Sequence, residues 1–221
     1  MKTNVGRVVG ALVFVQLAGL IVPFVLLDPA VKTDYMGVDA AMAGTIKTAV
    51  FMLFANAVVT LGIAIAAFPE LRRYSVRAAL LLIVISTVWV VMQSVDNAHL
   101  LSMLSLSTRY SDAAGANADL YNVLGSQVRS TRIWVHYTEL LVIDVWMAVF
   151  YSLCFVYRLV PRAIGAVGLV AVVVHLFAIP MAMFIGYPNG GFLGASLAVS
   201  HVLVGGWLIA KGLPAVEADT D

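Results

Sequence analysis

Two pairs of ionisable residues, each with members three positions apart, are the first candidates for chemistry in this sequence. Asp96 and His99 form one pair, and His136 and Glu139 form the other. Residues three apart share a face of an α-helix, so each pair would present its two groups together. Histidine with carboxylates suits a metal ion such as zinc or iron, or general acid–base catalysis. We therefore take these four as candidate metal ligands, and Glu139 also as a candidate catalytic residue.

Three more ionisable residues stand deep inside apolar runs. Counted from the ends of their runs, Asp144, His175 and His201 all lie near the middle of a membrane span. A lone charge there costs a few kcal/mol, so we expect Asp144 to face the interior and to pair with His175 or His201. Asp144 is a candidate catalytic residue, and the two histidines are candidate cofactor ligands, for example the axial ligands of a b-type haem. Smaller polar residues predicted to line the same interior are Gln16, Asn56, Ser86, Thr87 and Ser200.

The elements that must position these residues are membrane-spanning helices. The chain has 221 residues, of which 62% are hydrophobic and only 11% charged, with a mean hydropathy of +0.99. A soluble domain would have about a quarter of its residues charged. A span needs about 20 apolar residues. We therefore predict an all-α integral membrane protein, a single domain over residues 1–221, whose six-helix bundle has spans at residues 7–28, 48–68, 78–104, 133–157, 163–186 and 191–210.

Lysine and arginine predict the orientation. With both termini in the cytoplasm, eight Lys and Arg residues fall on the cytoplasmic side and five on the other. The bias is strongest in two short loops, around Arg72 to Arg77 and Arg158 to Arg162, where the positive-inside rule has most force. The two longer outer segments, residues 29–47 and 105–132, mix both signs. We expect them to form soluble caps that are partly helical and lie on the membrane surface, and the second to fold over the outer polar groups as a lid.

Several classes of protein are disfavoured by composition. The formal net charge of +1 and the lack of a basic run argue against a nucleic-acid partner. Cys154 is the only cysteine, which excludes an intrachain disulfide and a cysteine-based metal motif. The sequence has no HExxH motif and no glycine-rich phosphate loop. The metal hypothesis therefore depends on the histidine–carboxylate pairs alone.

The stretch WVHYTELLVIDVWMAVFYSLCFVYRLVPRAIGAVGLV resembles a bacterial membrane family catalogued as domain of unknown function 4386. In that family a histidine opens a helix that ends in a Tyr-Arg pair, followed by a Leu-Pro-Arg-like turn and a glycine-bearing helix. The start RVVGALVFVQLAGLI and the end GGWLIAKGLP are similar too. The resemblance implies a six-helix fold in the bacterial inner membrane and no particular activity. The matching positions here are His136, Tyr157, Arg158, Pro161, Arg162, Gly165 and Gly168.

Three functional classes remain open from the residues alone. The first is a membrane enzyme or cofactor protein whose polar interior binds or transforms a lipophilic molecule. The second is a small proton-coupled transporter that uses Asp144 and the histidines as a relay. The third is a homo-oligomer or an accessory subunit that packs against a larger membrane complex through small residues. The buried polar groups favour the first class.

The orientation is tested by cysteine labelling. In a background without Cys154, single cysteines at Ser75 and Gly115 should react with a membrane-impermeant maleimide from opposite sides of the membrane, because the Arg-rich loops stay inside. Ser75 should label only in inverted vesicles and Gly115 only in intact cells. Labelling of both residues from one side would contradict the topology.

Overall fold

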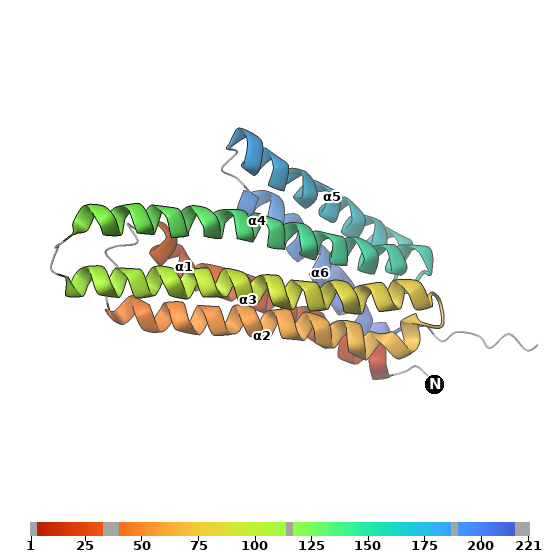
Figure 1. Cartoon of the computed structure of the whole chain (residues 1–221). Helices are drawn as coiled ribbons and strands as arrows, with labels where there is room; N and C mark the ends of the chain where they lie inside the picture. Colours follow the sequence, from red (N-terminus) through yellow and green to blue (C-terminus); the bar gives the residue numbers. More distant parts are fainter. Residues whose placement is uncertain (1–3, 33–39, 114–116, 187–189, 215–221) are drawn as a thin grey trace, which may run out of the picture.

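The computed structural model describes residues 4–32, 40–113, 117–186 and 190–214 (Figure 1). Its six helices are all long and apolar enough to cross a membrane, which confirms the all-α membrane fold. Each predicted span coincides with one helix to within a residue or lies inside it. The helices are α1 (Asn4–Lys32), α2 (Ala40–Leu71), α3 (Val76–Asp112), α4 (Ala118–Val156), α5 (Arg162–Ile185) and α6 (Gly190–Lys211).

The segment 105–132 is helical where the structure describes it, as expected in part, but the prediction of a separate cap that folds over the outer polar groups is wrong. Residues 105–112 continue α3 and residues 118–132 belong to α4, while residues 114–116 lie outside the described chain. Helices of 37 and 39 residues are about 55–60 Å long, nearly twice the thickness of a hydrocarbon core. Their outer parts still pack, because Val128 lies against a buried cluster that contains Met103 of α3 and Ile46 of α2, and Ser107 is fully buried.

The other predicted cap, residues 29–47, is shortened from both sides. The first helix continues to Lys32 and α2 already begins at Ala40, whereas residues 33–39 lie outside the described chain. Ile46 of this segment is fully buried in the same cluster. The sequence pattern failed here because polar residues on one face of a helix do not prevent the opposite face from packing.

The helices form a closed ring in chain order. Each helix contacts its neighbours in the sequence, and α6 returns to contact α1. Among the described residues, α3 and α5 share no backbone contact, so both lie beside α4 but not beside each other. Figure 1 shows α2, α3 and α4 running alongside one another, whereas α5 crosses at an angle. The outer side of α4 is therefore left uncovered between α3 and α5.

Glycines close the ring between α1 and α6. A Cβ atom on Gly10 would come within 2.8 Å of the Gly205 carbonyl oxygen and 2.9 Å of the Ile209 nitrogen. Gly6, one turn earlier, leaves equally little room against Leu213. Small residues four apart allow two membrane helices to approach to backbone contact, where dispersion and weak polar contacts hold them.

The two Arg-rich loops and the C-terminal end of α6 lie on the same side of the bundle. The ring of Tyr74, in the loop between α2 and α3, packs on Tyr157 at the end of α4, with centroids 5.3 Å apart. The Tyr74 hydroxyl also lies 3.5 Å from the Pro214 carbonyl oxygen. Burial and the nearby Glu70 carboxylate raise the pKa of Tyr74, so its hydroxyl stays protonated at neutral pH. This arrangement agrees with the predicted topology, in which these segments share the cytoplasmic side.

Gly10→Ala tests the closure of the ring. The added methyl group would overlap the α6 backbone, and overpacking of this kind costs about 1–3 kcal/mol. We expect a lower thermal unfolding temperature in detergent. Gly206→Ala is the matched control, because a Cβ there meets nothing within 4 Å and alanine favours the helix. Equal stability of the Gly10 and Gly206 variants would show that the contact is looser than described.

Candidate functional site

The buried carboxylate of α4 pairs with a histidine of α5. The Nδ1–H of His175 donates to Asp144 Oδ1 over 2.7 Å, and the two residues are 9% and 1% exposed. The expected pairing of Asp144 with a mid-span histidine is therefore confirmed. Gly194 of α6 lies against the same imidazole, since a Cβ there would be 3.7 Å from His175 Cδ2. Asp144, His175 and Gly194 form one level of the bundle, which we call the Asp144 layer.

A second polar level lies further along the same three helices. The Tyr151 hydroxyl is 2.8 Å from Ser200 Oγ and 3.4 Å from His201 Nδ1. The His201 Nδ1–H donates to the Leu197 carbonyl oxygen of its own helix over 2.7 Å. Gly168 of α5 faces the Tyr151 ring at a distance that leaves no room for a side chain. We call this level the Tyr151 layer.

The two layers are seven residues apart on every helix that forms them. Asp144 and Tyr151 on α4, His175 and Gly168 on α5, and Gly194 and His201 on α6 keep the same spacing. Seven residues are two helical turns, about 10.5 Å. Two nitrogens that bind one metal ion must lie within about 4 Å of each other. The haem hypothesis required His175 and His201 to lie at the same depth, and this expectation is therefore wrong. His175 contacts Asp144, whereas His201 lies beside Tyr151.

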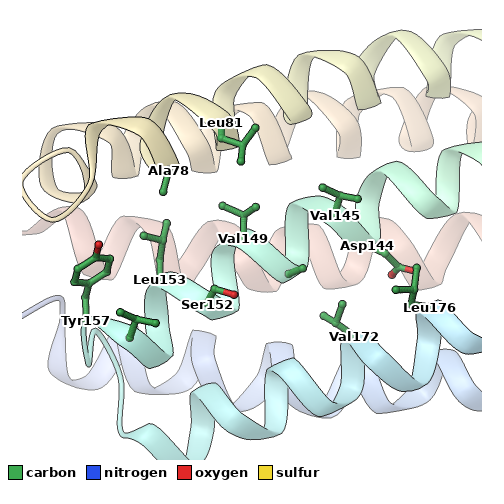
Figure 2. Close-up of a pocket in the computed structure, with 12 residues that line it drawn as sticks. Ala78, Leu81, Asp144, Val145, Val149, Ser152, Leu153, Tyr157, Val172 and Leu176 are labelled. Atoms are coloured by element: carbon green, nitrogen blue, oxygen red, sulfur yellow. The ribbon is translucent and has the colours of Figure 1, made fainter.

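A groove along α4 ends at the Asp144 layer (Figure 2). It holds about 440 Å³, which is within the range of small-molecule sites. Nine of its twelve lining residues are apolar, and the others are Asp144 at one end, Ser152, and Tyr157 at the opposite end. We call it the α4 groove; it is lined by Ala78, Leu81, Asp144, Val145, Ala148, Val149, Ser152, Leu153, Val156, Tyr157, Val172 and Leu176.

One oxygen of Asp144, a residue that lines this groove, has no hydrogen-bond partner. His175 occupies Oδ1, but Oδ2 is buried and has no hydrogen-bond partner. Buried polar atoms are nearly always paired with protein, water or a ligand. The wall of the groove is open on the lipid-facing side, where Val145 and Val156 are 50% and 59% exposed. The geometry therefore combines an apolar, chain-like space with one hydrogen-bond acceptor at its deep end.

Three of the four residues in the two outer pairs, Asp96–His99 and His136–Glu139, come together, and His99 is the exception. Asp96 of α3 and His136 and Glu139 of α4 have ligand atoms that all lie within 4.8 Å of one another. His136 Nδ1 is 3.3 Å from Glu139 Oε2, and the Trp89 indole N–H donates to Glu139 Oε1 over 2.9 Å. We call Asp96, His136 and Glu139 the outer cluster.

His99 does not belong to the outer cluster. Its Nδ1–H donates to the Val95 carbonyl oxygen of its own helix, and the described group of metal-ligating residues comprises the other three. A spacing of three residues leaves two side chains about 60° apart around the helix. That angle is enough for Asp96 to be 1% exposed while His99 is only half-buried.

Two residues of the outer region were missed from the sequence. Arg132 Nε lies 3.4 Å from Asp96 Oδ1, although the two atoms are not aligned for a hydrogen bond. The indole N–H of Trp89 donates to Glu139 Oε1. Helical periodicity would have found both, because Trp89 is two turns from Asp96, and Arg132 is one turn from His136. Arg132 was overlooked because it was assigned to a loop.

Four of the five smaller polar residues predicted to face inward do so. Gln16, Asn56, Ser86 and Ser200 are at most 3% exposed, and Gln16 Nε2 donates to Thr60 Oγ1 over 2.7 Å. Thr87 is exposed and donates its hydroxyl proton to the Ile83 carbonyl oxygen. That internal bond satisfies the hydroxyl without an interior partner, which is how threonine is tolerated on a lipid-facing helix surface.

The chain was compared with protein families, curated proteins and solved structures. A family model described as a domain of unknown function, 4386, matches residues 8–212. The match spans all six helices. No curated protein and no solved structure matches the chain.

His175→Ala tests the pairing in the Asp144 layer. Removing the imidazole leaves the carboxylate of Asp144 buried without its partner, and breaking a buried ion pair in this way costs about 3–5 kcal/mol. We expect a clearly lower unfolding temperature in detergent. The double variant Asp144→Asn/His175→Ala should recover part of the loss, because the uncompensated charge is gone. No recovery in the double variant would mean that the imidazole stabilises the fold by packing alone.

Proposed function

Because the chain belongs to the family of domain of unknown function 4386, whose name states no activity, we propose a function from the site itself. The protein is a multi-pass protein of the bacterial inner membrane that binds a lipophilic molecule in the α4 groove. The Asp144–His175 pair receives the polar group of that molecule. The observation that carries the proposal is the unpartnered, buried Asp144 Oδ2 at the end of an apolar groove.

The shape of the groove supports a long, narrow ligand. Asp144 and Tyr157 are thirteen residues apart on α4, which corresponds to about 20 Å along the helix. The walls between them are mostly valine, leucine and alanine. A hydrocarbon chain or an isoprenoid fits such a space, and its burial against these walls supplies the dispersion contacts on which binding within a membrane depends.

The carboxylate of Asp144 at one end of the groove determines which polar group the ligand must carry. The carboxylate oxygen Oδ2 accepts hydrogen bonds, so the ligand must donate one, as a hydroxyl or an amine does. A bond to a charged acceptor is worth about 1.5–3 kcal/mol. His175 donates to the other oxygen and so holds the carboxylate in place. The same pair is suited to accept a proton from the bound group, which is the acid–base role expected for Asp144.

The position of the groove supports entry from the lipid. Its open wall faces the acyl chains, and Tyr157 ends it beside the Arg158 loop and the Tyr74 ring. In the predicted topology this end belongs to the cytoplasmic leaflet. The six helices run unbroken through their spans, whereas many carriers build midplane sites from interrupted helices. The arrangement therefore favours a lipid-accessible binding or catalytic site over the transporter hypothesis.

The binding test uses molecules that co-purify with the protein. Full-length protein in mild detergent should retain a lipophilic alcohol or amine that mass spectrometry identifies after extraction. Ala148→Trp fills the groove and should reduce its amount at least tenfold. Asp144→Asn keeps an oxygen for His175 but loses the charged acceptor, so binding should weaken about 10- to 100-fold.

Val91→Trp is the matched control for the filled groove. Val91 is 57% exposed on α3 and does not line the groove, so the added indole leaves the groove open. This variant should retain the wild-type amount of ligand. If Ala148→Trp and Val91→Trp retain the same molecules in the same amounts, the α4 groove is not the binding site.

A further inference from the structure

We propose that the outer cluster binds one divalent transition-metal ion, with Zn²⁺ as its best match. This site is separate from the α4 groove, since it lies between α3 and α4 and shares none of the groove residues. Asp96 and Glu139 are 1% and 4% exposed, whereas the His136 side chain is 22% exposed. Two buried carboxylates thus lie beside a partly exposed imidazole.

The geometry is close to that of a bound ion. Zinc binds imidazole nitrogen and carboxylate oxygen at about 2.0–2.2 Å, so two ligand atoms of one ion are at most about 4.4 Å apart. One ligand atom from each residue lies within 4.8 Å of the other two. Small side-chain rotations would close the difference without moving a helix. Asp96 Oδ1 is buried and accepts no hydrogen bond, and only the charge of Arg132 is described beside it.

The surroundings of Glu139 position it as a ligand. The Trp89 indole N–H holds Oε1 at 2.9 Å, which leaves Oε2 directed at His136. Hydrogen bonds of this kind orient metal ligands, and losing one typically lowers metal affinity about 10- to 100-fold. In the metal-free protein the contact of His136 Nδ1 with Glu139 Oε2 requires a proton between them. A neutral imidazole can bind an ion through Nδ1 once this proton has moved to Nε2, so the ring keeps its single proton.

The ligand set selects the type of ion. One imidazole and two carboxylates suit zinc and neighbouring first-row divalent ions. Calcium prefers six to eight oxygen ligands, which this cluster does not offer. Three protein ligands would leave at least one coordination position for water, as in catalytic rather than structural zinc sites.

Arg132 competes with the metal ion for the carboxylate of Asp96. Its Nε lies 3.4 Å from Asp96 Oδ1, so its positive charge partly neutralises the carboxylates in the metal-free state. A divalent ion on Asp96 would be repelled by the guanidinium and must displace it. Removing this charge should therefore strengthen metal binding, whereas a purely structural ion-pair network would only lose stability.

The experiment measures metal binding by the full-length protein in detergent after removal of metals with a chelator. Titration with Zn²⁺ should show one ion per chain by calorimetry. Titration with Co²⁺ should give visible d–d bands that Zn²⁺ abolishes. His136→Ala and Asp96→Asn should each weaken Zn²⁺ binding by more than tenfold. Trp89→Phe should weaken it about tenfold, and Arg132→Gln should strengthen it by at least threefold.

His99→Ala is the matched control, because His99 lies one turn from Asp96 but outside the cluster. It should bind Zn²⁺ as the wild type does. The proposal is overturned if the wild type binds no stoichiometric ion, or if folded His136→Ala binds as tightly as the wild type. If His136→Ala does not fold, the Zn²⁺ affinities of Trp89→Phe and Arg132→Gln test the proposal, because the first should fall and the second should rise. Unchanged Zn²⁺ affinity in both variants also overturns the proposal.

Discussion

The contact between His175 and Asp144 is the interaction on which the arrangement of the C-terminal helices depends. A carboxylate in the middle of a membrane span is costly unless a neighbouring helix supplies a donor, and here the imidazole lies at 2.7 Å. That distance fixes the register of α5 against α4. Gly194 and Gly168 then allow α6 and α5 to approach the polar side chains closely. One polar pair and two glycines, which have no side chain, thus align three helices.

The same constraint governs the outer half of the bundle with different partners. Glu139 is 4% exposed and is held by Trp89 and His136, while Asp96 is balanced by Arg132. Both polar sites use α4, on different faces. Glu139 and Asp144 are five residues apart, which separates them by roughly 140° around the helix axis. One face of α4 therefore meets α3 and the other meets α5, so the two sites can bind different species.

Much of the candidate site was predictable because ionisable residues are rare in membrane spans. Asp96, His136, Glu139, Asp144 and His175 stand out in apolar runs, and the structure brings them together in two groups. The prediction for His99 was wrong because its imidazole hydrogen-bonds to a carbonyl oxygen of its own helix. The haem pairing failed because depth was counted from the ends of apolar runs. Those ends do not mark a fixed level when helices differ in length and tilt.

Composition and hydropathy by themselves determined six membrane helices and the residue types that must find partners, and the match of the sequence to a family model determined the family. Only the tertiary structure decided which partner each polar group takes. The rotation of a helix about its axis and its register against a neighbour are set by contacts between distant segments, such as Gly10 with Gly205 and Gly168 with Tyr151. The long hairpin of α3 and α4 was also decided there. Its outer turns pack inward, because Val128 lies against the buried cluster of α2 and Ser107 is fully buried. A local sequence pattern carries no information about such partners.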